Sequence, residues 1–166
     1  MKKYIITSLA LLLVLSLWNC EKDDICAETT PTTPNLVIDF YDTNNPTTLK
    51  NVTNLGVAEP TFTTGYAFNA VSTIKVPLRT NQETTTLRFV LNGSDEDTTN
   101  DLYNDITFNY ATKSVYISRA CGYKTQFALE TAIKSDVPTF TNWISSVEII
   151  QPNIENENET HVKIYF

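Results

Sequence analysis

Hydrophobic and polar residues alternate at every second position along much of the chain, and this spacing limits the fold more than any other feature. In the segment 84–91, one face of a strand would carry Leu87, Phe89 and Leu91. The segment 36–41 alternates in the same way and is predicted to be half-buried. A period of two is typical of a β-strand with one buried face. The sequence therefore predicts an all-β domain.

Turn residues and polar stretches divide this pattern into about eight to nine short strands. The segment 105–117 is the clearest predicted hairpin, with its turn at 111–114. The segment 125–133 contains helix-forming residues, but its alternation favours a strand. The last two strands would pair around the polar turn at 155–159. These last two predicted strands are 143–150 and 161–166. Two further strands are predicted at 48–58 and 65–78. The pattern predicts an antiparallel β-sandwich over residues 35–166, immunoglobulin-like or jelly-roll-like, with a closed barrel as the alternative.

The N-terminal stretch has the layout of a signal peptide. Lys2 and Lys3 precede the apolar run Ile5–Trp18, and Cys20 follows at once. A cysteine directly after such a run is where bacteria add a diacylglyceryl group before the peptide is removed. We therefore expect a signal peptide over residues 1–19 and a lipidated Cys20 that holds the chain to a bilayer. The alternatives are an ordinary signal peptide cut nearby and a retained transmembrane anchor.

The next segment, residues 20–34, is rich in charged residues, threonine and proline, so it reads as an extended tether. If Cys20 carries lipid, only Cys26 and Cys121 remain of the three cysteines. In an oxidising compartment these two are most economically joined in a disulfide. Closing so long a loop is worth about 4 to 5 kcal/mol in the chain-entropy treatment. The alternative is two separately buried thiols.

Charge and residue content narrow the function. The formal net charge of −7 argues against nucleic acid as a partner, because its phosphates would be repelled. The single histidine, His161, begins the last predicted strand, and no serine stands in a Gly-x-Ser-x-Gly motif. A strand histidine paired with a backbone or carboxylate neighbour is the preferred interpretation of His161. We expect neither an enzymatic activity nor a cofactor.

The acidic loop 92–101 offers carboxylates that could act as oxygen ligands for a metal ion. Asp95, Asp97 and Asp101 are weak candidates for calcium ligands, but the order of residues is not that of an EF-hand. A solvated loop without metal is the preferred interpretation. Thr98 lies in Asp97-Thr-Thr, which resembles the sequence at which Bacteroidota O-glycosylate exported proteins, and is a candidate glycosylation site.

Aromatic side chains could provide a carbohydrate-binding face, because sugar rings stack on aromatic platforms. Core packing is the preferred interpretation of the same residues. The candidates are Tyr41, Tyr66, Tyr103, Tyr116, Tyr123 and Trp143.

Several short motifs resemble a known family. The charged residues Glu21–Asp24 after Cys20 resemble the export tag of Bacteroidota surface lipoproteins. The motifs that carry the family resemblance are Asp23–Cys26, Thr33-Pro34, Ile117–Lys124, Trp143-Ile144 and His161–Phe166. Together they resemble an uncharacterised flavobacterial lipoprotein family, known only as a domain of unknown function. The resemblance implies a lipoprotein of the outer membrane, at the cell surface or the periplasmic face, and implies no activity.

These observations combine into one expectation about function. The protein is expected to be a lipid-anchored, non-enzymatic binding or structural module of the cell envelope. Its possible partners are a glycan or an envelope protein, in addition to the bilayer reached through Cys20. The alternative is an adhesion module that depends on carbohydrate or calcium.

Overall fold

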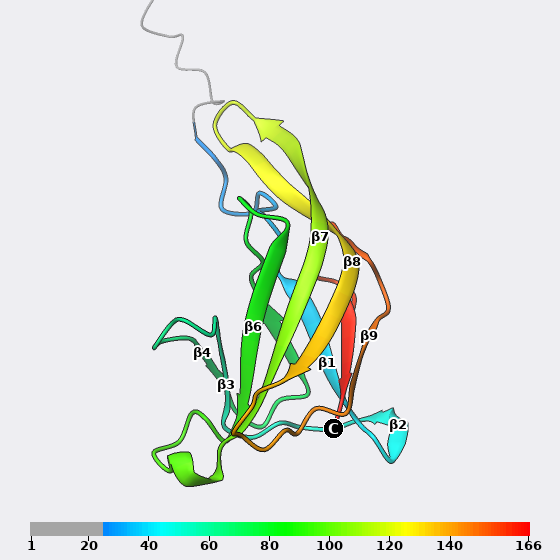
Figure 1. Ribbon diagram of the computed structural model, residues 1–166. Helices are drawn as coiled ribbons and strands as arrows, with labels where there is room; N and C mark the ends of the chain where they lie inside the picture. Colours follow the sequence, from blue (N-terminus) through cyan, green and yellow to red (C-terminus); the bar gives the residue numbers. More distant parts are fainter. Residues whose placement is uncertain (1–24) are drawn as a thin grey trace, which may run out of the picture. The chain divides into compact units, whose positions relative to one another are not determined.

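The computed structural model describes residues 25–166 (Figure 1). The described chain forms two compact units. The first holds residues 25–30 and 116–123, and the second holds Pro31–Val115 and Lys124–Phe166. The predicted signal peptide 1–19 and the lipidation site Cys20 lie outside the described residues. No helix within residues 25–166 is long and apolar enough to cross a membrane.

Eleven strands and one 3-10 helix make up the regular structure of the described residues. The strands are β1 (Leu36–Asp42), β2 (Asn45–Leu49), β3 (Leu55–Ala58), β4 (Tyr66–Phe68), β5 (Thr73–Val76), β6 (Thr84–Leu91), β7 (Leu102–Ser118), β8 (Gly122–Asp136), β9 (Ser146–Ile149), β10 (Asn153–Ile154) and β11 (Val162–Tyr165), and the 3-10 helix η2 spans Thr98–Asn100. The all-β prediction is confirmed, while the predicted number of eight to nine strands was too low.

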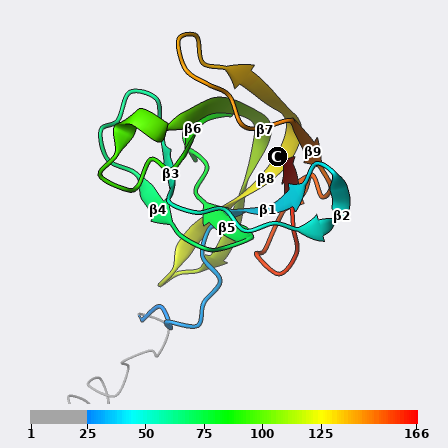
Figure 2. The same ribbon diagram turned by 90° about the horizontal axis from the view of Figure 1, so that it is seen from below.

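The strands form two sheets. One has the order β2-β1-β11-β9, with β5 also paired to β1, and the other has the order β10-β8-β7-β6-β3-β4. The second sheet is antiparallel and curls into a half-barrel, with β1 and β5 on its open side (Figure 2). The first sheet contains a parallel pair, β1 with β11. An immunoglobulin-like or jelly-roll arrangement is therefore not confirmed, and the prediction of purely antiparallel pairing was wrong.

Strand β1 is the most deeply buried element. All residues of Leu36–Phe40 are buried, including Val37 and Asp39, which the predicted half-buried strand would expose. β1 is a central strand of its sheet, with β11 on one edge and β2 and β5 on the other. Asp39 is accommodated because Thr73 and Thr160 each donate a hydroxyl hydrogen bond to its carboxylate, at 2.5 Å.

Several predicted boundaries differ from the structure. The segment 48–58 is divided between β2 and β3, and the segment 65–78 is divided between β4 and β5, which belong to different sheets. The predicted hairpin turn at 111–114 is part of the continuous strand β7. The predicted strand 125–133 is confirmed within β8, and the closing pair of strands is confirmed as β9 with β11.

The core of the second unit lies between the two sheets. The inward residues of β7 alternate as the sequence predicted, with Ile106, Phe108 and Tyr110 all buried. They meet the inward residues of β1 and β6 in one hydrophobic cluster. This cluster fixes the positions of the sheet edges where the candidate site is found.

Candidate functional site

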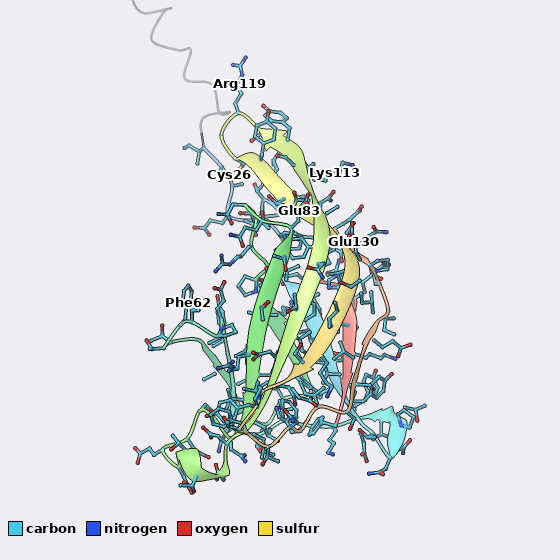
Figure 3. All side chains as sticks on the ribbon, viewed as in Figure 1. Cys26, Phe62, Glu83, Lys113, Arg119 and Glu130 are labelled. Carbon is cyan, nitrogen blue, oxygen red and sulfur yellow. A yellow bond between two sulfur atoms is a disulfide. The ribbon has the colours of Figure 1, made fainter. Side chains whose placement is uncertain are left out.

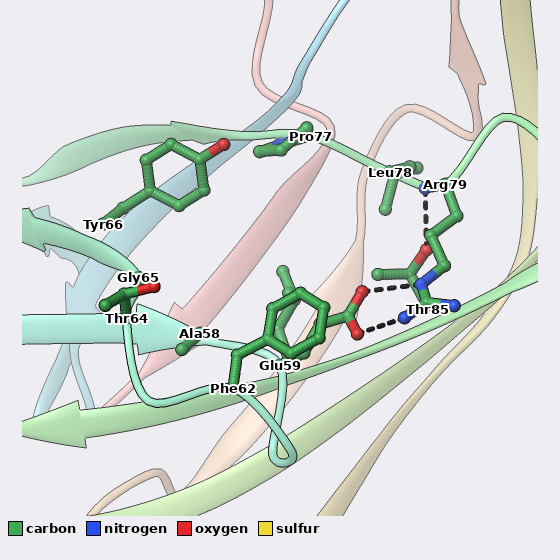
Figure 4. A pocket seen from close by; sticks show the side chains of 11 residues that line it. Ala58, Glu59, Phe62, Thr64, Gly65, Tyr66, Pro77, Leu78, Arg79 and Thr85 are labelled. Carbon is green, nitrogen blue, oxygen red and sulfur yellow. Dashed lines mark hydrogen bonds and ion pairs between the residues drawn. The ribbon is translucent and has the colours of Figure 1, made fainter.

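An apolar cavity lies in the second unit, between β4 at the edge of one sheet and the segment that follows β5 in the other (Figure 4). Its volume is about 370 Å³. Ala58 at the end of β3, Leu78 and Leu87 supply apolar lining. The two sheets are not joined by strand pairing at this edge, and Leu78 and Leu87 are buried core residues that form the floor of the cavity.

Two aromatic rings flank this cavity. Phe62 comes from the β3–β4 loop and is 60 % exposed, and Tyr66 begins β4 and is 51 % exposed. Figure 3 shows Phe62 extending from the loop, away from the sheet. The loop turns tightly before it, because the Phe62 amide donates a hydrogen bond to the Glu59 carbonyl at 2.9 Å. Large exposed aromatic side chains beside a cavity are typical of a binding surface.

An ion pair forms the polar side of the cavity. Arg79 Nε donates to Glu59 Oε1 at 2.6 Å, and Arg79 Nη2 donates to Glu59 Oε2, so the pair is bidentate. The hydrogen bond from Arg79 lowers the pKa of Glu59, and the same bond raises the pKa of Arg79. Both groups are therefore charged at neutral pH. The pair presents fixed donors and acceptors but no free acid or base.

A buried hydroxyl pair holds the arginine segment in place. Thr85 Oγ1 accepts from the Arg79 amide at 3.0 Å, and the Tyr110 hydroxyl donates to the Arg79 carbonyl at 2.8 Å. The two hydroxyl oxygens are 2.6 Å apart. Burial raises the pKa of Tyr110, so its hydroxyl stays protonated and can donate. These hydrogen bonds hold the backbone of Arg79 in place beside the cavity.

A glycine permits the close approach of β3 and β4. A Cβ on Gly65 would overlap the Val57 carbonyl oxygen and lie 2.6 Å from the Ala58 Cβ. Only a residue without a side chain allows the chain to pass there. The same loop borders a second hollow of about 420 Å³ on its other side, which extends to Arg88 and Tyr103.

Of the residues at this site, Tyr66 was a sequence candidate and Phe62 was missed. The signal that could have identified Phe62 is a large apolar residue inside the polar stretch Pro60–Gly65, between two predicted strands. The Glu59–Arg79 pair could not be predicted, because the two residues lie on different segments that only the fold brings together.

The other aromatic candidates are divided between core and surface. Trp143 packs against Phe40 and Phe166 and donates its indole hydrogen bond to the Phe89 carbonyl. Tyr41 and Tyr103 are half-buried against other aromatic rings. Tyr116 and Tyr123 are exposed in the first unit. The structure does not gather the six predicted aromatic candidates into one face.

The structure contains the predicted disulfide between Cys26 and Cys121, which are separated by 95 residues. Both cysteines belong to the first unit. The alternative of two separate thiols was therefore wrong.

The carboxylates of the acidic loop accept hydrogen bonds from the loop and from neighbouring residues, while Asp101 Oδ1 is buried without a partner among the residues that the structure describes. Asp95 accepts from Asn54 Nδ2 and from the Asp97 amide, and Asp97 accepts from the amide and hydroxyl of Thr99. The bonds from Thr99 lower the pKa of Asp97. Asp101 accepts from the Tyr103 hydroxyl at 2.9 Å. Within residues 25–166, no three His, Cys, Asp or Glu side chains are grouped so that they could hold a metal ion.

Thr98 is exposed at the start of η2, and its glycosylation stays a prediction.

His161 is fully buried and has a structural partner. Its Nδ1 accepts a hydrogen bond from the Val37 amide at 3.0 Å. Burial lowers the pKa of His161, although Glu157 and Glu159 act in the opposite direction. Because Nδ1 is an acceptor, the ring is neutral with its proton on Nε2. The backbone partner agrees with the preferred interpretation, although His161 lies just before β11 rather than within the strand.

Comparison with known proteins identifies the family without an activity. Neither a curated protein nor a solved structure matches the chain. The Bacteroidota origin and the lipoprotein character implied by the resemblance stay predictions. Residues 51–166, more than half of the chain, match the family of unknown function DUF6452, and the protein therefore belongs to that family.

Proposed function

We propose that this protein is a lipid-anchored, non-enzymatic binding module of the cell envelope, whose ligand occupies the cavity beside Phe62 and Tyr66. The observation that carries this proposal is the pair of exposed aromatic rings at an apolar cavity of about 370 Å³. A cavity of this size with few, fixed polar groups suits a small ligand or one segment of a longer one.

The polar groups at the cavity favour binding over catalysis. Glu59 and Arg79 neutralise each other, so neither is poised to take up or release a proton near neutral pH. His161 is fully buried just before β11 and takes no part in the cavity lining.

The anchor part of the proposal is supported by the sequence before residue 25. The positively charged start, the apolar run and Cys20 together favour lipidation and attachment to the outer membrane, at the cell surface or the periplasmic face. The net charge of −7 favours partners other than nucleic acid.

A carbohydrate is the ligand class that the site favours, which makes a carbohydrate-binding adhesion module the second candidate. A sugar ring can stack its apolar face on Phe62 or Tyr66, while its hydroxyl groups meet the Glu59–Arg79 pair. The calcium-dependent form of this candidate has no comparable support, because no three His, Cys, Asp or Glu side chains are grouped to hold a metal ion among residues 25–166.

A glycan array tests this proposal directly. The intact protein should retain at least one class of envelope or environmental polysaccharide, and the Phe62→Ala/Tyr66→Ala double variant should lose it. The control is Ile133→Ala, which removes a residue that is also exposed but lies outside the cavity. Equal binding by the double variant would show that the cavity is not the site. The intact mass of the membrane-extracted protein tests lipidation at Cys20 separately.

A further inference from the structure

The first unit gathers exposed apolar side chains beside the disulfide. Tyr116 and Tyr123 meet edge to face, with ring centroids 5.3 Å apart, and they are 55 % and 68 % exposed. Ile25 is 84 % exposed. Ile25 and Tyr116 border the same hollow of about 460 Å³, next to Cys121. Several large apolar side chains exposed in so small a unit indicate a contact surface.

The disulfide limits how far this surface can lie from the chain's proposed anchor. The chain from Cys20 to Cys26 spans at most about 22 Å even when fully extended, at roughly 3.6 Å per residue. Cys26 is bonded to Cys121 in the turn between β7 and β8. If Cys20 is inserted through its lipid, the turn is therefore held close to the lipid headgroups, whatever path the intervening residues take.

We propose that the surface formed by Ile25, Tyr116 and Tyr123 docks onto the bilayer that holds the Cys20 lipid. This inference rests on the lipid anchor of the proposed function. Tyrosine suits a membrane interface, because its ring can enter the apolar side while its hydroxyl stays hydrated. Arg119, in the same turn, is exposed and points away from it (Figure 3), so its guanidinium can reach phosphate groups while its stem lies against the lipid.

The charges near this surface determine the kind of membrane contact. Four acidic residues and one lysine lie between Cys20 and Thr30, so the segment is not basic; the acidic residues are Glu21, Asp23, Asp24 and Glu28. Arg119 adds a single positive charge. Docking is therefore driven by apolar insertion rather than by attraction to anionic lipid. It should occur on zwitterionic vesicles and change little with salt.

Hydroxyl-radical footprinting of the protein in phosphatidylcholine vesicles tests the docking. Oxidation of Tyr116 and Tyr123 should fall severalfold relative to the lipid-free Cys20→Ser protein. Tyr66 is the internal reference, because its exposed fraction of 51 % is close to that of Tyr116. Unchanged oxidation of Tyr116 and Tyr123, or an equal fall at Tyr66, would overturn the proposal.

A matched pair of variants separates docking from shielding by the vesicle. Ile25→Lys places a charge on the surface without affecting a buried contact, and should restore much of the oxidation of Tyr116 and Tyr123. Ile133→Lys, an exposed isoleucine of the second unit, should not. If both variants behave like the original protein, Ile25 is not part of a docking surface and the proposal fails.

The intact mass distinguishes this proposal from the one on which it rests. A protein without lipid at Cys20 would refute the proposed anchor. Its free Cys20 thiol would then be coupled to vesicles that contain a maleimide-headgroup phospholipid, and the same footprinting would still decide whether the surface docks.

Discussion

Individual buried polar residues form hydrogen bonds with backbone amides of other segments in this fold. His161 is fully buried, and its Nδ1 accepts from the Val37 amide. Burial lowers its pKa from the ordinary value of 6.5, so the unfolded chain takes up this proton at a higher pH than the folded protein does. The free energy of unfolding should therefore fall as the pH is lowered from about 7 through 6.5 and toward the lowered folded pKa, and should be level above that window. Urea unfolding at a series of pH values measures this slope.

The control for this pH dependence is His161→Asn. The Asn oxygen can still accept from the Val37 amide, but the side chain does not titrate. The variant should be less stable at every pH, because it leaves space in the core, yet it should lose the slope that begins below about pH 7. An unchanged slope would mean that another group takes up the proton.

Asn104 is a second buried polar residue, and it occupies a core position of β7. Its Oδ1 accepts from the amides of Trp143 and Ile144, at 2.9 and 2.8 Å. Asn104→Ala would leave both amides without this acceptor and should lower the free energy of unfolding by about 3 kcal/mol. Asn109 also lies in β7 and makes one exposed hydrogen bond to Thr131 of β8, so Asn109→Ala should cost well under half as much. Chemical denaturation of the two variants compares them, and equal losses would contradict a structural role for the buried amide.

At the scale of elements, a polar stretch in the sequence marked the part of a strand that extends beyond the core, not the end of the strand. Residues 111–114 were predicted to form a turn because they are polar, yet they continue β7 with both faces exposed. They contain neither Gly nor Asn, the residues that a tight hairpin turn favours. The chain reverses instead before Gly122, whose φ is +68°. A glycine in the left-handed region was the better turn signal.

The junction of β3 and β4 depends on one glycine, and this can be tested. Gly65→Ala would force the new methyl group against the Val57 carbonyl, so the two strands must separate. We expect a loss of about 1–3 kcal/mol in the free energy of unfolding, as for other overpacked sites. Amide exchange in β4 should accelerate more than elsewhere. Gly56→Ala in β3, where the nearest atom is 3.4 Å away, is the control and should have a smaller effect.

For the whole molecule, the sequence predicted which residues of a strand face the core better than which strands pair with each other. Alternation identified the inward residues of β6 and β7, because each strand's buried face can be recognised locally. It could not predict the parallel pairing of β1 with β11, because these strands are far apart in the sequence. The alternation within one strand also does not indicate which strand pairs with it. The cavity could not be predicted from the sequence for the same reason. Glu59 and Arg79 follow two different predicted strands, so only the fold reveals their pairing.

The disulfide, by contrast, could be predicted from the number of cysteines. Its effect is on the free energy of unfolding of the whole chain. It closes a loop with a sequence separation of 95, so its loss should lower the free energy of unfolding by about 2–5 kcal/mol, mainly because the unfolded chain gains freedom. The upper end is the chain-entropy value, and measured losses are often smaller. The measurement is urea unfolding of Cys26→Ser/Cys121→Ser in a Cys20→Ser background, where no thiol can exchange. Neither disulfide cysteine belongs to the second unit, so its aromatic near-UV signal should be retained in the folded variant. An unfolding midpoint equal to that of the disulfide-bonded protein would show that the bond does not restrain the unfolded chain, whereas loss of the near-UV signal would show that the core itself depends on it.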